Sequence, residues 1–286
     1  MTDKTGPGGA DPGGIEDLAE RLVAADPLLG PWRGAIARRL RRAAELEARL
    51  TGGRMRLADF ASGHEYFGLH RRGGEWVLRE WAPNATRVSL VGQMTDWRES
   101  PRFALERLEG AEGVWEIRLP ASAMAHGDLY RLRVHWIGGQ GERIPAWARR
   151  VVQDPQTLIF NAQVWDPPSA YRWRREGFRC AVRTPFVYEA HVGMAQEEER
   201  VGTYREFTEK VLPRIVRAGY DVLQLMAIQE HPYYGSFGYQ VSSFFAASSR
   251  FGTPEDLKAL IDAAHEAGLC VVMDLVHSHA ASNEVE

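Results

Sequence analysis

The sequence has only two cysteines, Cys180 and Cys270, and so lacks the dense cysteine spacing of a secreted disulfide scaffold. Cys270 lies in an apolar, strand-like run, and we expect both side chains to remain thiols in a reducing compartment. The N-terminus has no basic start followed by an apolar stretch, and nowhere do about 18 apolar residues run together as a membrane span requires. These absences predict a cytoplasmic protein without a membrane segment.

A strong charge of one sign is also missing. The formal net charge is −3, because 35 lysines and arginines nearly balance 38 aspartates and glutamates. Such a balance gives no broad attraction for nucleic-acid phosphates or anionic membranes. The 286 residues, of which 44% are hydrophobic, suit a globular protein of two domains with an extra helical segment.

The N-terminal region falls into a leader and a helical segment. Residues 1–14 contain five glycines and two prolines with almost nothing apolar, which predicts a disordered leader. Over residues 15–58, apolar residues recur at helical spacing in two series separated by breakers. Four arginines lie on the polar side of the second helix, where a solvated face explains them better than an anion site does: Arg38, Arg39, Arg41 and Arg42.

Short alternating runs then predict an all-β sandwich, which we place at residues 59–168. The clearest run is Tyr130 to Trp136, where apolar residues alternate with Arg131, Arg133 and His135 and so predict one buried face and one wet face. Turn signals at 72–74, 83–84 and 138–139 separate such runs as hairpins require.

Residues 169–286 change to alternating strands and helices. Apolar strands are expected at 186–192, 221–226 and 269–276, with helices that begin at Thr203 and Thr253. Nearly continuous apolar strands joined by helices predict a parallel sheet, either doubly wound or in a (β/α)8 barrel.

The expected loops indicate the ligand, because ligands gather at the carboxyl ends of parallel strands in both folds. No glycine-rich phosphate loop follows the first strand. The second strand leads into a long polar and aromatic loop at 229–245, and the third leads into Asp274, His277 and His279. Flat rings, a carboxylate and imidazoles suit an uncharged carbohydrate.

These segments carry a family resemblance. DLVHSHAASN (274–283) resembles the third-strand region of glycoside hydrolase family 13. YEAHVGM (188–194), the long string at 224–257 and VHSHAASN (276–283) resemble 1,4-α-glucan branching enzymes more specifically, and WAPNATRVSLVGQMTDW (81–97) resembles a family 48 carbohydrate-binding module. The resemblance implies a helical segment, a sandwich and the first three βα units of a (β/α)8 TIM barrel.

The same resemblance implies roles for single residues. Tyr239 corresponds to the ring that stacks on the sugar at the cleavage subsite, and Asp274 and His279 to residues that shape this pocket. The alternatives are that Tyr239 only packs in its loop and that Asp274 only caps a strand. His277 is a weaker candidate that packing alone explains.

Neither a metal nor another cofactor is expected. Ser278 stands where many amylases have an asparagine that helps to hold calcium. A zinc site built from Asp274, His277 and His279 is a weak alternative, since two histidines two residues apart on an extended segment are a poor ligand pattern.

In the sandwich, the resemblance implies glucan binding at Trp81, Pro83 and Trp97. Met94, Thr95 and Asp96 depart from the residues that usually precede the tryptophan at 97. Trp97 therefore stays open between sugar binding and packing in the core.

The resemblance implies that α-1,4-glucan is cleaved and transferred to a 6-hydroxyl by a retaining mechanism, which needs two carboxylates about 5 Å apart. In the family these come from later barrel strands, so we expect no nucleophile or acid/base within residues 1–286, no activity of this segment alone, and an unpaired third strand. A non-catalytic glucan-binding protein and a debranching hydrolase are the alternatives. The expected partner is glycogen, amylose or a starch-like polymer, and the oligomeric state stays open.

Overall fold

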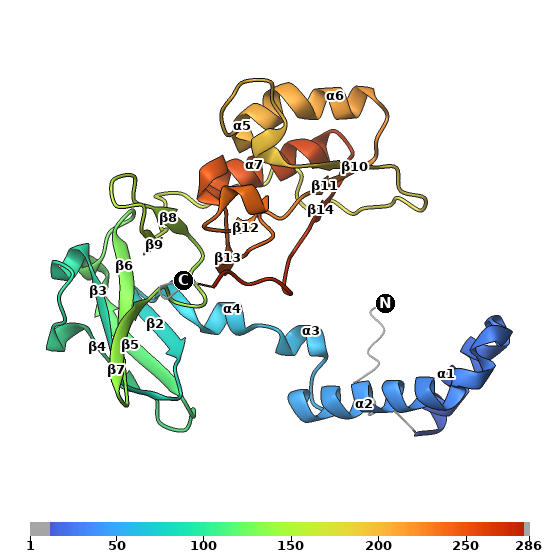
Figure 1. Cartoon of the computed structure of the whole chain (residues 1–286), viewed down its shortest axis with the longest axis horizontal. Coiled ribbons are helices and arrows are strands. Elements are labelled where there is room, and N and C mark those ends of the chain that lie inside the picture. Colours follow the sequence, from blue (N-terminus) through green and yellow to red (C-terminus); the bar gives the residue numbers. More distant parts are fainter. Residues whose placement is uncertain (1–11, 283–286) are drawn as a thin grey trace. The chain divides into compact units, whose positions relative to one another are not determined.

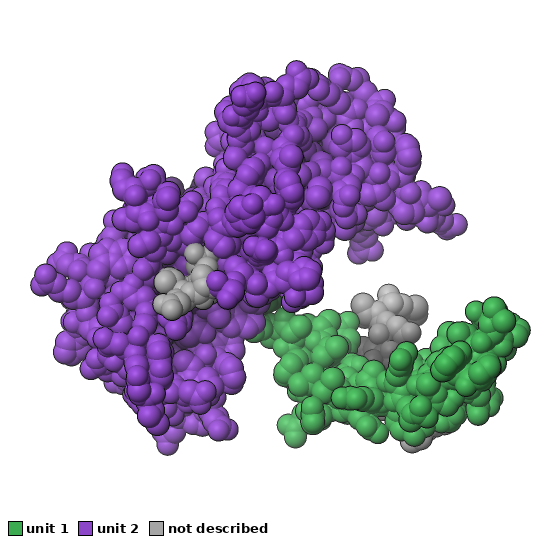
Figure 2. All heavy atoms as spheres, in the orientation of Figure 1, with its two compact units in different colours: residues 1–66 green, residues 67–286 purple. Residues whose placement is uncertain are grey.

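The computed structural model describes residues 12–282, and the chain divides into two compact units, Met1–Tyr66 and Phe67–Glu286 (Figure 2). Most of the leader expected at 1–14 lies outside the described residues. Its last three residues, Pro12 to Gly14, are helical, so this part of the expectation was wrong. Asn283, the end of the third-strand motif, also lies outside the described range.

The first unit is helical to its end. Glu16 and Glu20 of its first helix pair with Arg41 and Arg33 at 2.8 and 2.5 Å, which ties the two long helices together. Because the last short helix ends at Tyr66, the sandwich begins later than the boundary of 59 that we expected. The elements are α1 (Pro12–Ala25), a 3-10 turn (Pro27–Trp32), α2 (Arg33–Thr51), α3 (Leu57–Phe60) and α4 (Gly63–Tyr66).

The second unit opens with a sandwich in which, within residues 12–282, nine strands form one folded sheet in the order β1-β2-β5-β4-β3-β6-β9-β8, with β7 beside β6 (Figure 1). Side chains from both halves of the sheet bury one core that includes Leu78, Leu90 and Leu132. The strands are β1 (Gly68–Arg72), β2 (Glu75–Trp81), β3 (Ala85–Gly92), β4 (Ala104–Arg107), β5 (Val114–Pro120), β6 (Leu129–Trp136), β7 (Gly139–Arg143), β8 (Val151–Gln153) and β9 (Phe160–Gln163). Short 3-10 turns lie at Gln93–Thr95, Pro101–Phe103 and Ala121–Ala123.

Two of the three predicted turns are hairpin turns, at 72–74 between β1 and β2 and at 138–139 between β6 and β7. The hairpin expected at 83–84 was wrong, because the strands it connects, β2 and β3, do not pair with each other. Gly73 and Gly74 adopt φ of 57° and 88° between β1 and β2, which only glycine does without strain. The wet face predicted for β6 was wrong at one position, because Arg131 is buried. Its guanidinium donates to the Phe160 carbonyl at 3.0 Å and to Glu142 at 2.6 Å, and these partners satisfy the charge that burial removes from water.

After the sandwich, three parallel strands confirm the predicted parallel sheet: β10 (Val187–Ala190), β11 (Val222–Leu225) and β14 (Cys270–Met273), in that spatial order. Helices pack along this sheet (Figure 1). They are α5 (Tyr204–Glu206), a π-helical turn (Phe207–Val211), α6 (Leu212–Arg217) and α7 (Pro254–Glu266). A small antiparallel pair, β12 (Gln229–Glu230) with β13 (Ser243–Ala247), begins and ends the stretch expected as a loop at 229–245, and β13 runs two residues past it. Short 3-10 turns occur at Val192–Met194, Tyr234–Ser236 and Ser249–Phe251.

Local capping chemistry fixes where these helices begin. The Thr203 hydroxyl accepts from the Glu206 amide at 3.2 Å, and the Glu206 carboxylate accepts from the Thr203 amide at 3.1 Å. Thr253 and Asp256 form the same reciprocal pair ahead of α7, with Pro254 at its first position. Both predicted helix starts are confirmed.

The segment between the sandwich and β10 has little regular structure but is held to α7 by one buried carboxylate. Asp262 is completely buried and accepts from the Tyr171 hydroxyl at 2.9 Å and from the amides of Arg174 and Arg175 at 2.8 and 3.0 Å. Burial alone would raise the pKa of Asp262, but these hydrogen bonds and the Arg174 guanidinium outweigh it and lower the pKa.

A disulfide fastens the same segment to the sheet. Cys180 and Cys270 are bonded, with their Cα atoms 5.4 Å apart, so the expectation of two free thiols was wrong in this structure. The ring of Phe178 stacks on His265 of α7 at 4.1 Å and brings Cys180 to the start of β14. Sequence spacing could not indicate this pair, because the two cysteines are 90 residues apart.

The sandwich and the parallel sheet pack as one body within the second unit. Arg150 donates to the Gly252 carbonyl at 2.7 Å and lies over the Trp165 ring, whose indole N–H donates to Glu255 of α7 at 2.9 Å. Trp147 stacks on Phe245 of β13 with ring centroids 4.1 Å apart. No helix within residues 12–282 is long and apolar enough to cross a membrane.

Replacing Asp262 by alanine should lower the free energy of unfolding by about 3 kcal/mol, because two backbone amides and a hydroxyl would lose a charged acceptor in a buried place. Chemical denaturation measures the change. The matched control is Glu266→Ala, which removes an exposed partner of Arg174 and should cost less than about 0.5 kcal/mol. Equal losses in the two variants would contradict the role given to Asp262.

The disulfide predicts that protein prepared without reductant and then denatured exposes no free thiol to a thiol-reactive dye. Reduction should lower the free energy of unfolding by about 2–4 kcal/mol, since the bond closes a long loop in the unfolded chain. Two thiols that react before reduction would restore the expectation from the sequence.

Candidate functional site

The candidate site lies where β11 and β14 end side by side. Leu225 pairs with Met273 at the last step of the parallel ladder, and the Asp274 amide donates to the Leu225 carbonyl at 3.0 Å. Each strand therefore delivers its following residues to the same edge of the sheet. This is the carboxyl end, where parallel sheets with crossover helices place their ligands.

Two of the predicted site residues meet there. The Tyr239 hydroxyl donates to Asp274 Oδ2 at 2.8 Å, although the residues are 35 positions apart. The hydrogen bond to Asp274, together with burial, raises the pKa of Tyr239 to about 12. A neutral ring beside a carboxylate offers a face for stacking and an acceptor for a sugar hydroxyl.

Two residues with positive φ precede Tyr239 and form a tight turn. Phe237 and Gly238 adopt φ of 54° and 89°, and Phe237 is one of the few non-glycine residues in this left-handed region. Gly238 approaches the segment that follows β11 so closely that a Cβ on it would lie 1.9 Å from the Ala227 carbonyl oxygen. Only glycine fits this position, so the turn is fixed against the end of β11.

The third predicted residue, His279, joins the site through its backbone. Its carbonyl accepts from the Val241 amide at 3.1 Å, and the Ala281 amide donates to the Val241 carbonyl at 2.8 Å. The His279 side chain is exposed, and its neighbour His277 lies beside the Phe244 ring at 6.1 Å between centroids. The structure thus brings Tyr239 and Asp274 into contact and holds His279 on the adjoining segment.

Two glutamates near these strand ends are engaged in other contacts. Glu230 is completely buried, accepts from the Ser249 amide at 2.6 Å and pairs with Arg250 at 3.3 Å. Glu189 is exposed and accepts from Gln224 at 2.9 Å. Glu230 holds the chain between β13 and α7, which is a structural role.

Two histidines are buried behind the site. His191 follows β10, and His231 follows β12; both lie against the Phe251 ring, at 5.5 and 6.4 Å. Burial lowers the pKa of each side chain. Both ring nitrogens of His191 and Nε2 of His231 have no hydrogen-bond partner among residues 12–282. A positive charge here would be poorly solvated, so the folded state favours neutral rings.

In the sandwich, Trp81 and Pro83 lie side by side at the end of β2. Trp81 is 58% exposed, and a Cβ on Gly113 would lie 2.9 Å from atoms of both residues, so the missing side chain of Gly113 makes room for them. Next to Trp81 is a cavity of about 360 Å³ that also reaches Phe244 of β13 and Glu80. Burial raises the pKa of Glu80 to about 7, although the amides of Trp81 and Ala146 donate to its carboxylate.

Trp97 stands on a strained turn. Asp96 and Trp97 have φ of 49° and 58°, and strain of this kind gathers at functional sites. The indole is 36% exposed, and one face lies over the Arg131 guanidinium, 5.5 Å from the ring centroid. No pattern in the sequence indicated that Arg131 is buried beneath this ring.

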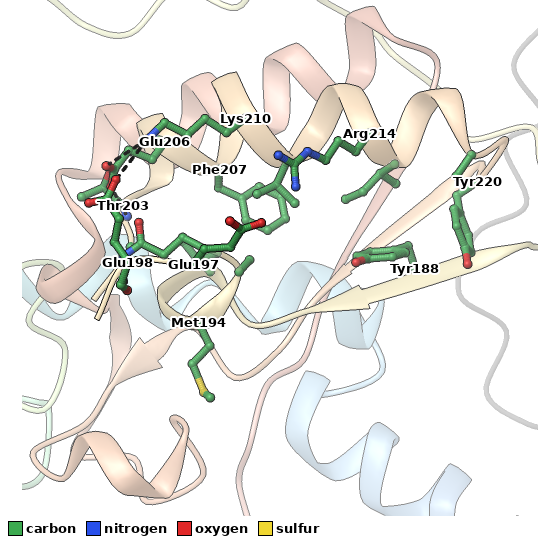
Figure 3. Close-up of a pocket in the computed structure, with 17 residues that line it drawn as sticks. Tyr188, Met194, Glu197, Glu198, Thr203, Glu206, Phe207, Lys210, Arg214 and Tyr220 are labelled. Atoms are coloured by element: carbon green, nitrogen blue, oxygen red, sulfur yellow. Dashed lines mark hydrogen bonds and ion pairs between the residues drawn. The ribbon is translucent and has the colours of Figure 1, made fainter. Parts of the chain in front are cut away.

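A larger cavity, of about 690 Å³, lies elsewhere, along β10 and α6 (Figure 3). It contains none of the six predicted site residues. Among the residues that line it, Glu206 belongs to the capping box of α5 and pairs with Lys210 and with the neighbouring Arg200. The hydrogen bond from Arg200 lowers the pKa of Glu206 to about 2. Within residues 12–282, no three side chains gather as metal ligands.

Two family models match the chain. Residues 66–155 match carbohydrate-binding module 48 (isoamylase N-terminal domain), and residues 190–286 match the alpha amylase catalytic domain. A 1,4-alpha-glucan-branching enzyme from Rhizophagus irregularis is 43% identical over 95% of this chain and 40% of its own length, and one from Solanum tuberosum is 42% identical over 92% and 31%. The resemblance to 1,4-alpha-glucan-branching enzymes is confirmed. The chain spans about two fifths or less of these curated relatives.

Solved structures agree on the fold. A Salmonella typhimurium protein described as an alpha amylase superposes with a TM-score of 0.62 at 26% identity, over 76% of this chain and 34% of that one. A pullulanase from Bacillus acidopullulyticus superposes with a TM-score of 0.56 at 17% identity, over 75% and 30%, which supports the fold alone. The two family models place a carbohydrate-binding module before part of an alpha amylase catalytic domain, in the expected order.

The two buried histidines predict how stability depends on pH. Because burial lowers the pKa of His191 and His231, the unfolded chain binds more protons than the folded one below about pH 6.5, and the free energy of unfolding should fall as the pH drops. Thermal unfolding across this range measures the slope. A variant with both His191→Asn and His231→Asn should show a smaller slope than the parent.

The control for this prediction is His279→Asn, which replaces a histidine whose side chain is exposed rather than buried. An undiminished slope in the double variant would contradict the role assigned to the buried pair.

Proposed function

We propose that this chain is part of a 1,4-α-glucan branching enzyme, which cleaves an α-1,4 chain and transfers the cleaved segment to a 6-hydroxyl of a glucan. The observation that carries the proposal is the Tyr239–Asp274 hydrogen bond at the carboxyl end of the sheet, inside the segment that matches the alpha amylase catalytic domain. A ring and a carboxylate held together suit a sugar ring with hydroxyls at its edge.

Each site residue has a role in this proposal. Tyr239 stacks on the sugar at the cleavage subsite, Asp274 orients the phenol and accepts from a sugar hydroxyl, and the exposed imidazole of His279 lines the same pocket. Retaining transfer also needs a nucleophilic carboxylate and an acid/base. None of the three residues fills these two roles.

The parallel strands β10, β11 and β14 are, in this proposal, the first three strands of a (β/α)8 barrel. Five large apolar side chains at the two outer strands support it, because a closed barrel would cover them: Phe186, Val187, Val272, Met273 and Leu275 are 41–54% exposed.

In the sandwich, we assign glucan binding to Trp81, Pro83 and Trp97. The exposed indole of Trp81 beside Pro83 forms an apolar platform, and Arg131 holds the Trp97 ring from one side. The expected cytoplasmic location stays a prediction.

A glucan-binding protein without catalysis is the second candidate, because the tryptophan platforms would bind glucan in either case. The site at the strand ends favours the enzyme over this alternative. Reaction products separate the candidates, since binding alone forms no new linkage.

In the full-length protein, Tyr239→Ala should reduce branching about 100-fold through loss of the stacking ring, and Tyr239→Phe about tenfold through loss of the bond to Asp274. The assay incubates amylose with enzyme and follows the fall in iodine absorbance and the appearance of α-1,6 linkages by NMR. Tyr220→Phe is the matched control, since this ring stacks on Phe186 away from the site. Reducing ends without new α-1,6 linkages would indicate a hydrolase instead, and glucan binding without products a binding protein.

A further inference from the structure

One buried side chain joins the two segments that carry the candidate site. Gln229 is the first residue of β12 and is 4% exposed. Its Oε1 accepts from the Val276 amide at 2.8 Å, and its Nε2 donates to the Phe244 carbonyl at 3.0 Å. Val276 lies two residues after Asp274, and Phe244 lies five residues after Tyr239.

The Val276 amide and the Phe244 carbonyl depend on this side chain because the ladders of the neighbouring strands do not supply a partner for either group. The parallel ladder of β14 ends at Met273, so the buried Val276 amide lies beyond it. The pairing of β12 with β13 is irregular: Gln229 lies opposite Ala247, but Glu230 lies opposite Ser243, which leaves Phe244 in a bulge. Backbone groups left without partners in a buried place destabilise the structure, and one amide side chain satisfies two of them.

The same region is packed on both sides. Ala227, Val241 and Val276 form a small buried cluster, against which Tyr239 and Phe244 pack. The contact of Gly238 with Ala227 fixes one end of the Tyr239 turn, and the bridge between Val241 and Ala280 fixes the other. Besides the hydrogen bond from Tyr239 to Asp274, the Gln229 side chain connects this loop to the start of the 274–281 segment.

We propose that Gln229 is a positioning residue that sets the contact between Tyr239 and Asp274, and thereby the geometry of the sugar subsite. The inference rests on the proposed function for its effect on catalysis but not for its effect on the hydrogen bond itself. Glutamine suits the role because it offers a donor and an acceptor on one side chain. Methionine has nearly the same length and offers neither, and glutamate at neutral pH offers only acceptors.

The first test observes the hydrogen bond directly. Tyrosine carrying carbon-13 at Cζ is incorporated into the full-length protein, and the Tyr239 signal is assigned as the one that Tyr239→Phe removes. In Gln229→Met this signal should shift. The pKa of Tyr239 measured from it should fall below the value of about 12 that the hydrogen bond to Asp274 supports. A Tyr239 signal that keeps the parental shift and titration in folded Gln229→Met would overturn the proposal, whatever happens to activity.

The second test uses turnover. Gln229→Met should branch amylose about 10- to 100-fold more slowly, because a small misplacement of a positioned group costs that much. The matched control is Gln153→Met, which removes an amide that donates to the Leu158 carbonyl at 2.9 Å in the sandwich and should leave turnover unchanged. Equal turnover in Gln229→Met and the parent would overturn the proposal for catalysis.

Gln229→Glu separates positioning from a general loss of stability. Its carboxylate can still accept from Val276 but faces the Phe244 carbonyl without a proton, and protonation restores the donor. Since burial raises the pKa of a carboxyl group, activity relative to the parent should rise as the pH falls from about 8 to about 6, whereas Gln229→Met should show no such recovery. If the activity of Gln229→Glu does not recover at low pH, the proposal that Gln229 acts through both hydrogen bonds, to Val276 and to Phe244, is contradicted.

Failure of the proposed function would look different. If the full-length parent forms no α-1,6 linkages, the proposed function fails, and the Cζ signal of Tyr239 still decides the positioning role. If the parent branches amylose while Gln229→Met leaves the Tyr239 signal unchanged, the function stands and the positioning role falls.

Discussion

The parallel pairing of β11 with β14 is the constraint on which the site depends. The register sets Leu225 opposite Met273, so both strands end at the same level and their following residues emerge together. A slip of one residue would turn the buried side chains of β11 out of the core shared with the helices. The hydrophobic burial that fixes the register therefore also places Asp274 within 2.8 Å of Tyr239. Stability and site geometry have the same origin here.

Packing between the sandwich and the sheet extends this constraint to the whole second unit. Ala246 of β13 lies in the sandwich core, and Trp147 stacks on Phe245. The loop that carries Tyr239 is thus held at one end by β11 and at the other by the sandwich. The exposed ring of Trp81 and the loop that carries Tyr239 are connected within this unit, since the cavity beside Trp81 is lined by Phe244 of the same loop.

The sequence allowed the regular elements to be predicted because their signals are local. Helix starts at Thr203 and Thr253 depend on neighbours within a few positions. The alternation expected along β6 was only partly right, because Tyr130, Arg131 and Leu132 are buried in succession. The contact between Tyr239 and Asp274 was predicted only indirectly. The strand ends indicated where a site would lie, and the family resemblance indicated which residues form it. The disulfide, the burial of Arg131 and the role of Asp262 were missed, because each depends on partners far along the chain or on how a loop folds back. Residue types alone carry no signal for such contacts.

Gln229 shows why buried polar side chains that satisfy backbone groups are not found by searching the sequence for motifs. A polar residue within a stretch expected to be a loop suggests solvent or ligand, yet this amide is buried and satisfies the backbone at the end of one ladder and in the bulge of another. The irregular pairing of β12 with β13 creates the need, and that irregularity is visible only in three dimensions. Places where ladders end beside a ligand site leave backbone groups to be satisfied by side chains, so such side chains govern the site without touching the ligand.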